Sequence, residues 1–209
     1  MKGKFITFEG IDGSGKTTQV NKFLKALESK GIAYKFFREP GGTRIGENLR
    51  EFLLDNKNND MKPVTELLLY CASRAQLVPE IIDNLEKGLW VVCDRFIDST
   101  LCYQGYGRGL DKDFIRKANE FVCSGKFPDV TFYIKIDYKT SIDRQSARNG
   151  KKDRLENEES DFFYRLIDGF DYIAREYNER ISVIDGSLTE EEVFNDVLSQ
   201  LRIKTGVNL

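Results

Sequence analysis

The chain of 209 residues contains no histidine. This absence excludes Ser-His-Asp triads, Cys-His dyads and histidine-ligated zinc sites. Cysteine is also scarce, and no two cysteines have the CxxC spacing of a zinc site. The four cysteines are Cys71, Cys93, Cys102 and Cys123. We therefore expect free thiols in a reducing compartment, and a chemistry that relies on carboxylates, cations and backbone amides.

The chain also lacks a long hydrophobic run and a strong excess of either charge. No apolar stretch approaches the ~18 residues of a membrane span. The opening segment MKGKFITFEG has neither the longer apolar stretch nor the small-residue cleavage site of a signal peptide. A net charge of −2 disfavours nucleic-acid binding by overall electrostatics. These features predict a cytoplasmic protein with no membrane or nucleic-acid partner.

What the sequence does contain is a regular alternation of strand and helix patterns. Apolar runs predict strands at residues 5–9, 34–38, 89–94, 130–136 and 181–184. Helical periodicity predicts helices at residues 16–29, 45–54, 64–87, 111–124, 140–148, 161–179 and 189–201. We expect Pro79 to kink or divide the third helix. The alternation predicts one α/β domain over residues 1–209, with a five-stranded parallel sheet flanked by helices on both faces.

Residues 10–17, GIDGSGKT, match the phosphate-binding pattern GxxxxGK[ST] in full, between a predicted strand and a predicted helix. The glycines let backbone amides face the phosphates, and the helix N-terminus adds partial positive charge. Lys16 can reach the β- and γ-phosphates, and Thr17 can bind Mg²⁺. The residues predicted to bind ATP are Gly10, Ile11, Asp12, Gly13, Ser14, Gly15, Lys16, Thr17 and Thr18. Asp12 is either a solvated loop carboxylate or an acid that shapes the metal site or repels a misplaced phosphate.

This loop does not decide what receives the phosphate, because GTPases, ATPases and kinases all use it. The chain has no NKxD-type motif to read guanine, which disfavours a GTPase. An ATPase that acts as a switch stays an alternative. Such a switch needs no second cationic site.

A second set of cations and aromatic residues follows the other predicted strands. Arg38 follows the second strand, and Asp94 and Arg95 end the third, where a parallel sheet binds its ligands. Arg50 and Arg74 lie on the helices that follow the second strand. A guanidinium can grip a phosphate with two hydrogen bonds, and aromatic rings can stack on a base. The set therefore indicates an acceptor site for a second nucleotide.

Taken in order, several segments resemble bacterial-type thymidylate kinases, and the resemblance covers nearly the whole chain. The segments are the phosphate loop, REPGGT, the ASR segment, DRFIDSTLCYQGYGRG, FPDVTFYIKID and RLENEESDFFYRLIDGF. The resemblance implies a P-loop nucleoside monophosphate kinase fold and a homodimer. It also implies transfer of the γ-phosphoryl group of ATP to dTMP, with Mg²⁺. A kinase of another deoxynucleoside monophosphate is the alternative within the same class.

The resemblance also implies roles at the acceptor site. Arg38, Arg50 and Arg95 should hold the dTMP phosphate, while Asp94 binds Mg²⁺ through water or orients that phosphate. Tyr70 should stack on thymine, with Arg74 and Gln104 hydrogen-bonded to the base edge. The full set of implied dTMP-binding residues is Arg38, Pro40, Arg50, Tyr70, Arg74, Arg95, Thr100, Tyr103 and Gln104. Tyr103 should crowd the 2′ position of the sugar, and the bond between Glu39 and Pro40 is expected to be cis.

Residues 147–159, ARNGKKDRLENEE, place several cations around a glycine between two predicted helices. By composition alone this is a solvated, flexible basic loop. In bacterial-type thymidylate kinases the corresponding segment is a lid that brings an arginine to the transferring phosphoryl group. The resemblance makes Arg148 and Arg154 the candidates, with Lys152 assisting. Together with Lys16, Asp94 and Arg95 they form the expected catalytic set.

Overall fold

The computed structural model describes residues 3–147 and 153–209. Its centre is a five-stranded sheet in the order β2-β3-β1-β4-β5, and every neighbouring pair of strands is parallel. The strands are β1 Phe5–Glu9, β2 Tyr34–Arg38, β3 Trp90–Asp94, β4 Val130–Lys135 and β5 Ile181–Asp185. The predicted parallel sheet is confirmed, with each strand within about two residues of its expected bounds.

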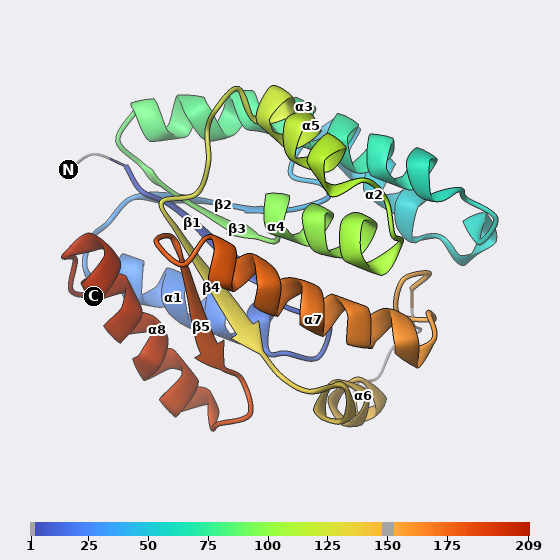
Figure 1. The fold of residues 1–209 in the computed structure, drawn as a ribbon. Coiled ribbons are helices and arrows are strands. Elements are labelled where there is room, and N and C mark those ends of the chain that lie inside the picture. The colour runs from blue at the N-terminus through green and yellow to red at the C-terminus, as the bar shows by residue number, and fades with distance from the viewer. Residues whose placement is uncertain (1–2, 148–152) are drawn as a thin grey trace.

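Helices cover both faces of this sheet, as Figure 1 shows. They are α1 Lys16–Ser29, α2 Arg44–Leu54, α3 Pro63–Glu86, α4 Ile97–Thr100, α5 Lys112–Cys123, α6 Tyr138–Ala147, α7 Ser160–Glu176 and α8 Glu190–Thr205. A short 3₁₀ turn, η1, spans Asn56–Asn58, and a π-helical segment, η2, spans Leu101–Gly107. α1 and α8 lie together on one face of the sheet, while α3 and α5 lie on the other (Figure 1).

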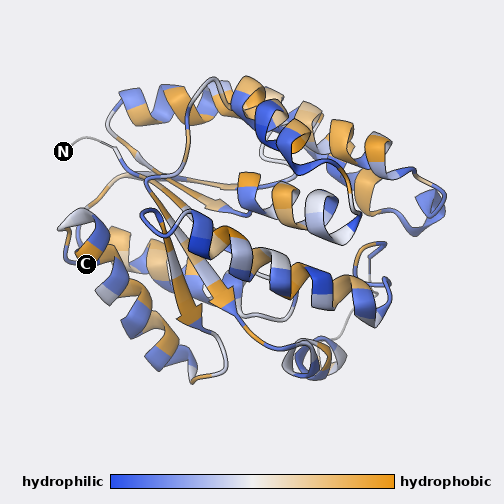
Figure 2. Cartoon of the chain, viewed as in Figure 1, coloured by the Kyte–Doolittle hydropathy of each residue, from blue (hydrophilic) through white to orange (hydrophobic). Residues whose placement is uncertain are grey.

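The three central strands, β1, β3 and β4, are buried on both faces. Ile6 and Phe8 of β1 are fully buried in a cluster with Phe23 of α1. Phe5, which points the other way, meets the ring of Phe96 at 5.0 Å between centroids. In Figure 2 the strands at the centre of the sheet show much orange, whereas the helices alternate between the two colours. This is the pattern of parallel strands that are buried on both sides.

Two expectations for the helices need correction. Pro79 does not divide the third helix, because α3 runs unbroken from Pro63 to Glu86. A proline clashes with the carbonyl four residues earlier, but Ala75 and Pro79 are both exposed, so that carbonyl can tilt into solvent. The segment after Phe96, for which no helix was predicted, is helical and consists of α4 and η2.

The register of the strands brings three strand ends to the same edge of the sheet. Asp94, the last residue of β3, pairs with Phe8 of β1 on one side and with Arg38 of β2 on the other. The chain leaves central β1 toward β2 and β3, and later crosses to β4 and β5 on the opposite side of β1. Ligands of such sheets bind outside the carboxyl ends of the strands, near this change of direction. Within the described ranges, no helix has the length and apolar character needed to cross a membrane.

Candidate active site

The loop between β1 and α1 wraps a helix N-terminus without blocking it. Gly10, Gly13 and Gly15 have φ angles of 139°, 79° and 91°, which glycine adopts far more readily than other residues. A Cβ at Gly10 would lie 2.5 Å from the carbonyl oxygen of Ile134, so the loop also needs glycine for space. In the part of the chain that the structure describes, no side chain caps α1 at Gly15. The first amides of α1 therefore remain available to an anion.

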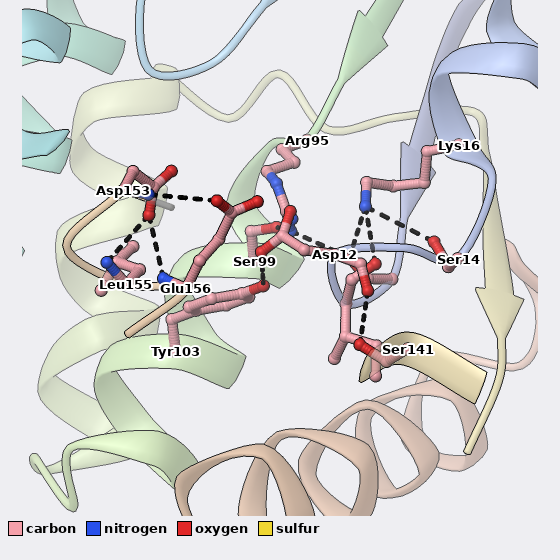
Figure 3. A network of polar contacts seen from close by, with 12 residues as sticks. Asp12, Ser14, Lys16, Arg95, Ser99, Tyr103, Ser141, Asp153, Leu155 and Glu156 are labelled. Atoms are coloured by element: carbon pink, nitrogen blue, oxygen red, sulfur yellow. Dashed lines mark hydrogen bonds and ion pairs between the residues drawn. The ribbon is translucent and has the colours of Figure 1, made fainter. Parts of the chain in front are cut away.

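Lys16, the first residue of α1, extends back across this loop (Figure 3). Its ammonium donates to the carbonyl oxygens of Gly10 at 2.8 Å and Ile11 at 3.0 Å. Burial, followed by the charge of Arg95, lowers the pKa of Lys16 to about 8. A nearby anion would restore the charged form, so the lysine is suited to a phosphate that reaches the loop.

Asp12 connects the loop to the end of β3 (Figure 3). Its Oδ1 accepts a hydrogen bond from Arg95 Nη2 at 2.8 Å, and its Oδ2 lies 3.5 Å from the hydroxyl of Tyr103. Arg95 also donates to the carbonyl oxygen of Gly10 at 2.9 Å, from a backbone with a φ of 67°. The carboxylate of Asp12 is therefore not simply a solvated loop group. It is paired with Arg95, a predicted acceptor-site residue.

Arg38, Thr17 and Asp94 line one cavity beside the phosphate loop. Asp94 Oδ1 is buried and has no hydrogen-bond partner in the described ranges. Arg38 is half-exposed and lies 3.5 Å from a carboxylate oxygen of Glu47. An orphaned carboxylate oxygen on a residue that shares a cavity with a threonine fits a hard cation such as Mg²⁺.

A second cavity opens between the ends of the strands, α3 and η2. It contains all but one of the predicted dTMP-binding residues, Arg38 being the exception. Those present are Pro40, Arg50, Tyr70, Arg74, Arg95, Thr100, Tyr103 and Gln104. Asp12, Glu39, Phe96, Ser99 and Asp153 also contribute to its wall. The peptide bond between Glu39 and Pro40 is cis, as expected.

Arg74 forms the floor of this cavity and is 1% exposed. Its Nε and Nη2 donate to Glu39 Oε2 at 2.8 and 2.7 Å, and Nη1 donates to Asn119 Oδ1 at 2.6 Å. Nη2 also donates to the hydroxyl of Thr100 at 2.8 Å. The guanidinium lies 5.0 Å from the ring centroid of Phe96. Three partners and a ring therefore fix this cation in one orientation.

The segment that follows the lid residues packs against α2 and α3. Residues 148–152, which include Arg148, Lys151 and Lys152, lie outside the described residues. Arg154 is buried, and it donates to the carbonyl oxygen of Leu53 at 2.9 Å and to Glu66 Oε2 at 2.5 Å. Asp153 instead faces the acceptor cavity, and its Oδ1 accepts from the amides of the next turn (Figure 3). In this arrangement Arg154 is apart from the phosphate loop.

Comparisons with known proteins identify the family of the chain. The family model described as thymidylate kinase matches residues 8–197. The chain is 50% identical over 188 residues to the thymidylate kinase of Caldanaerobacter subterraneus subsp. tengcongensis, covering 89% of this chain and 88% of that one. It is 45% identical to the thymidylate kinase of Thermoanaerobacter sp. over 203 residues, or 97% and 98% of the two chains.

The chain belongs to the thymidylate kinase family. A third relative, the thymidylate kinase of Kosmotoga olearia, is 46% identical over 197 residues and 94% of each chain. The matches extend over the phosphate loop, the acceptor cavity and the segment after the lid residues. The resemblance stated from the motifs is therefore confirmed, and with it the fold class.

Several residues that contact the predicted site residues were not themselves predicted to belong to the site. Glu39 was expected only as the residue before a cis proline, with no role for its side chain, and Asn119 carried no signal. Glu66, which accepts hydrogen bonds from Gln104 and Arg154, could have been found. Glu66, Tyr70 and Arg74 are spaced by four residues, which puts them on one face of a helix. Because Glu66 shares a helix face with two residues predicted to contact the nucleotide, the sequence alone could have indicated that it lies near the site.

Proposed function

We propose that the protein transfers the γ-phosphoryl group of ATP to dTMP, giving dTDP and ADP. The observation that carries this proposal is that two sites, the phosphate loop and the acceptor cavity, lie next to each other at one edge of the sheet. The phosphate loop faces a cavity rich in arginine, and the pair of Asp12 and Arg95 at 2.8 Å connects them. A donor and an acceptor held on adjacent strand ends can be brought in line for direct transfer.

The charges around the acceptor cavity support binding of a phosphate there. The pKa of Arg50 lies below its usual range because of burial and then the charge of Arg38, with Arg95 adding to the effect. A guanidinium whose charge is disfavoured by burial and by two neighbouring cations is relieved by a dianion that binds beside it. Arg50 is oriented by its hydrogen bond to the carbonyl oxygen of Pro40 at 3.0 Å. We infer that Arg38, Arg50 and Arg95 hold the acceptor phosphate.

We infer that Mg²⁺ is held by Thr17 and Asp94, the latter directly or through water. Among the residues described, no cluster of three or more carboxylates or thiols could form a metal cage. Mg²⁺ usually takes one or two protein ligands and completes its shell with water and phosphate oxygens, so two side chains suffice to hold it. When bound, the ion would neutralise charge on the β- and γ-phosphates.

The rest of the acceptor cavity suits a pyrimidine deoxynucleotide. We infer that Tyr70 stacks on the base, and that Arg74, Gln104 and nearby Thr100 meet its edge. Tyr103 is buried, with its ring held edge-on against Phe162 and Phe170. A ring fixed in this way can leave no room for a 2′-hydroxyl group.

The transfer itself needs no general base, because the acceptor phosphate oxygen is already anionic. This agrees with a chain that has no histidine. Lys16 and the first amides of α1 stabilise the charge that spreads over the transferring group. We infer that a lid cation, Arg148 or Arg154, adds to them. For Arg154 this requires the segment to rearrange, since its guanidinium now pairs with Glu66.

We further propose that the protein acts in the cytoplasm as a homodimer. Exposed apolar side chains on the adjacent helices α2 and α3 support the dimer. They are Ile45, Phe52, Val64 and Leu68.

The decisive experiment is a coupled ADP-release assay with dTMP, dUMP, dCMP, dGMP and UMP, each with and without Mg²⁺. We expect dTMP to give the highest kcat/KM, and all activity to require the metal. A different preferred acceptor would identify a kinase with another base choice. Slow ATP hydrolysis that no nucleotide accelerates would identify a switch-like ATPase and overturn the proposal.

A further inference from the structure

Glu66 of α3 is a buried carboxylate that none of the steps above uses. It is 1% exposed and lies behind the acceptor cavity rather than on its wall. Its Oε1 accepts from Gln104 Nε2 at 2.9 Å and from Arg108 Nε at 3.2 Å. Its Oε2 accepts from Arg108 Nη2 at 3.2 Å and from Arg154 Nη2 at 2.5 Å. Both oxygens are thus surrounded by donors.

These donors decide the charge of Glu66. Burial alone would raise its pKa, but the hydrogen bonds and charge of Arg108, the amide of Gln104 and the charge of Arg154 outweigh burial. The pKa of Glu66 accordingly lies below its usual range, and the group is ionised at neutral pH. An ionised carboxylate only accepts hydrogen bonds. Whatever faces it must donate.

This constraint orients the side chain of Gln104. An amide has a donating end and an accepting end, and either can face a neutral partner. Beside ionised Glu66 only the NH₂ end is compatible, so the carbonyl oxygen is the end left for the cavity that Gln104 lines. Gln104 is 1% exposed, and a reversed amide would set its oxygen against the carboxylate in a buried place.

We propose that Glu66 is a positioning residue that makes the site select pyrimidines with an N3–H group. The inference rests on the proposed function, in which Gln104 meets the base edge. A fixed carbonyl oxygen accepts from the N3–H of thymine or uracil, whereas N3 of cytosine is itself an acceptor and would face that oxygen unpaired. Thymine and uracil share this edge, so Glu66 does not distinguish dTMP from dUMP.

The test is the variant Glu66→Gln, assayed for kcat/KM with dTMP, dUMP and dCMP. The introduced amide has nearly the same shape as the carboxylate, but it could present either end to Gln104. The carbonyl oxygen of the introduced amide would face the arginines around the former Oε2. Its NH₂ group would then face Gln104, and the amide of Gln104 could reverse. We expect the ratio of dTMP to dCMP to fall at least about tenfold. The ratio of dTMP to dUMP should stay within about threefold.

Arg108→Lys is the matched control, since it keeps a positive charge beside Glu66, so that the carboxylate stays ionised, while it removes the forked hydrogen bonds of the guanidinium and leaves Gln104 and Arg154 in place. We expect it to keep the wild-type ratio of dTMP to dCMP. The proposal is overturned if Glu66→Gln lowers kcat/KM for all three nucleotides by the same factor, or if the charge-conserving Arg108→Lys changes the ratio equally. If the wild type does not phosphorylate dTMP, the proposed function fails instead.

A measurement on the wild type decides the question even if Glu66→Gln does not fold. In protein labelled with ¹⁵N-glutamine, the Nε2 protons of Gln104 should resist solvent exchange before any nucleotide is added, because Glu66 already holds the group. Protection that appears only with dTMP would mean that the NH₂ end faces the base. That result would overturn the orientation.

Discussion

At the scale of single residues, Arg74 is a cation that the protein surrounds before any nucleotide arrives. Glu39 shares its burial, at 3% exposed, and one oxygen of that carboxylate has no hydrogen-bond partner in the described ranges. Burial raises the pKa of Glu39, and Arg74 opposes this effect. The pair therefore stabilises the cavity only while both partners are present.

This interdependence predicts a large loss of stability for Arg74→Gln. The variant leaves Glu39 buried without a counter-charge, which typically costs about 3 to 5 kcal/mol. Urea unfolding monitored by circular dichroism measures it. Arg38→Gln is the control, because its pair with Glu47 is half-exposed and should contribute less than about 1 kcal/mol. Equal effects of the two substitutions would contradict the role given to Glu39.

The raised pKa of Glu9, the last residue of β1, should make the stability of the protein depend on pH. Burial, followed by the charge of Asp98, raises its pKa to about 8 from an ordinary 4.5. The folded state thus favours the protonated form, and the unfolding free energy falls as the pH rises from 4.5 to about 8.

Glu9→Gln cannot ionise, so its unfolding free energy relative to wild type should increase across this window. The slope is at most about 1.4 kcal/mol per pH unit. Paired unfolding curves from pH 5 to pH 8 provide the difference, in which other titrating groups largely cancel. A difference that is constant with pH would show that Glu9 is ionised throughout.

The sequence was enough to predict charged residues that belong to a motif or follow a strand. It was not enough to predict residues whose role is to contact another side chain. Arg38 and Asp94 could be predicted because the ends of parallel strands meet at one edge, and Lys16 because it belongs to the phosphate-loop motif. Glu39 and Asn119 could not, because their roles consist of contacts with Arg74 across 35 and 45 residues. Such pairings depend on how α3 packs against the strand ends and α5. No local pattern encodes that packing.

At the scale of elements, strands and long helices were predictable because each buries a continuous apolar face. The segment formed by α4 and η2 was not, since Gly105, Gly107 and Gly109 gave it the composition of a loop. Its backbone has wide turns, as in the bond from Arg108 N to Tyr103 O at 2.9 Å. Gly107 is required there, because a Cβ would meet the ring of Phe162 at 2.5 Å. Tertiary packing against α7 therefore overrides the local preference for a loop.

The lid segment provides a prediction at the same scale. If Arg154 leaves Glu66 to stabilise the transferring phosphoryl group, Arg154→Ala should lower kcat by roughly 10²-fold or more. The KM for dTMP should change little. Steady-state kinetics and thermal unfolding of the same preparations separate this role from a purely structural one. A destabilised variant with unchanged kcat would show that Arg154 only holds the segment to α3.

At the scale of the whole molecule, four of the exposed apolar side chains lie on two adjacent helices. Ile45 and Phe52 of α2 are 43% and 50% exposed, and Val64 and Leu68 of α3 are 54% and 52% exposed. The two helices pack side by side, so these side chains belong to neighbouring elements. Apolar groups gathered in this way are more costly to leave in water than single exposed residues, and they mark a surface suited to a second copy of the chain.

The proposed homodimer therefore predicts that Leu68→Glu produces a monomer. Two glutamates related by the dimer axis would each have to be desolvated at the interface, while in a monomer the same side chain stays in water. Analytical ultracentrifugation at micromolar concentration should give twice the chain mass for the wild type and the chain mass for the variant. Ile203→Glu is the control, since Ile203 is 69% exposed on α8, across the sheet, and should leave the dimer intact. A monomeric wild type, or a dimeric Leu68→Glu variant with an unchanged unfolding temperature, would rule out this surface as the interface.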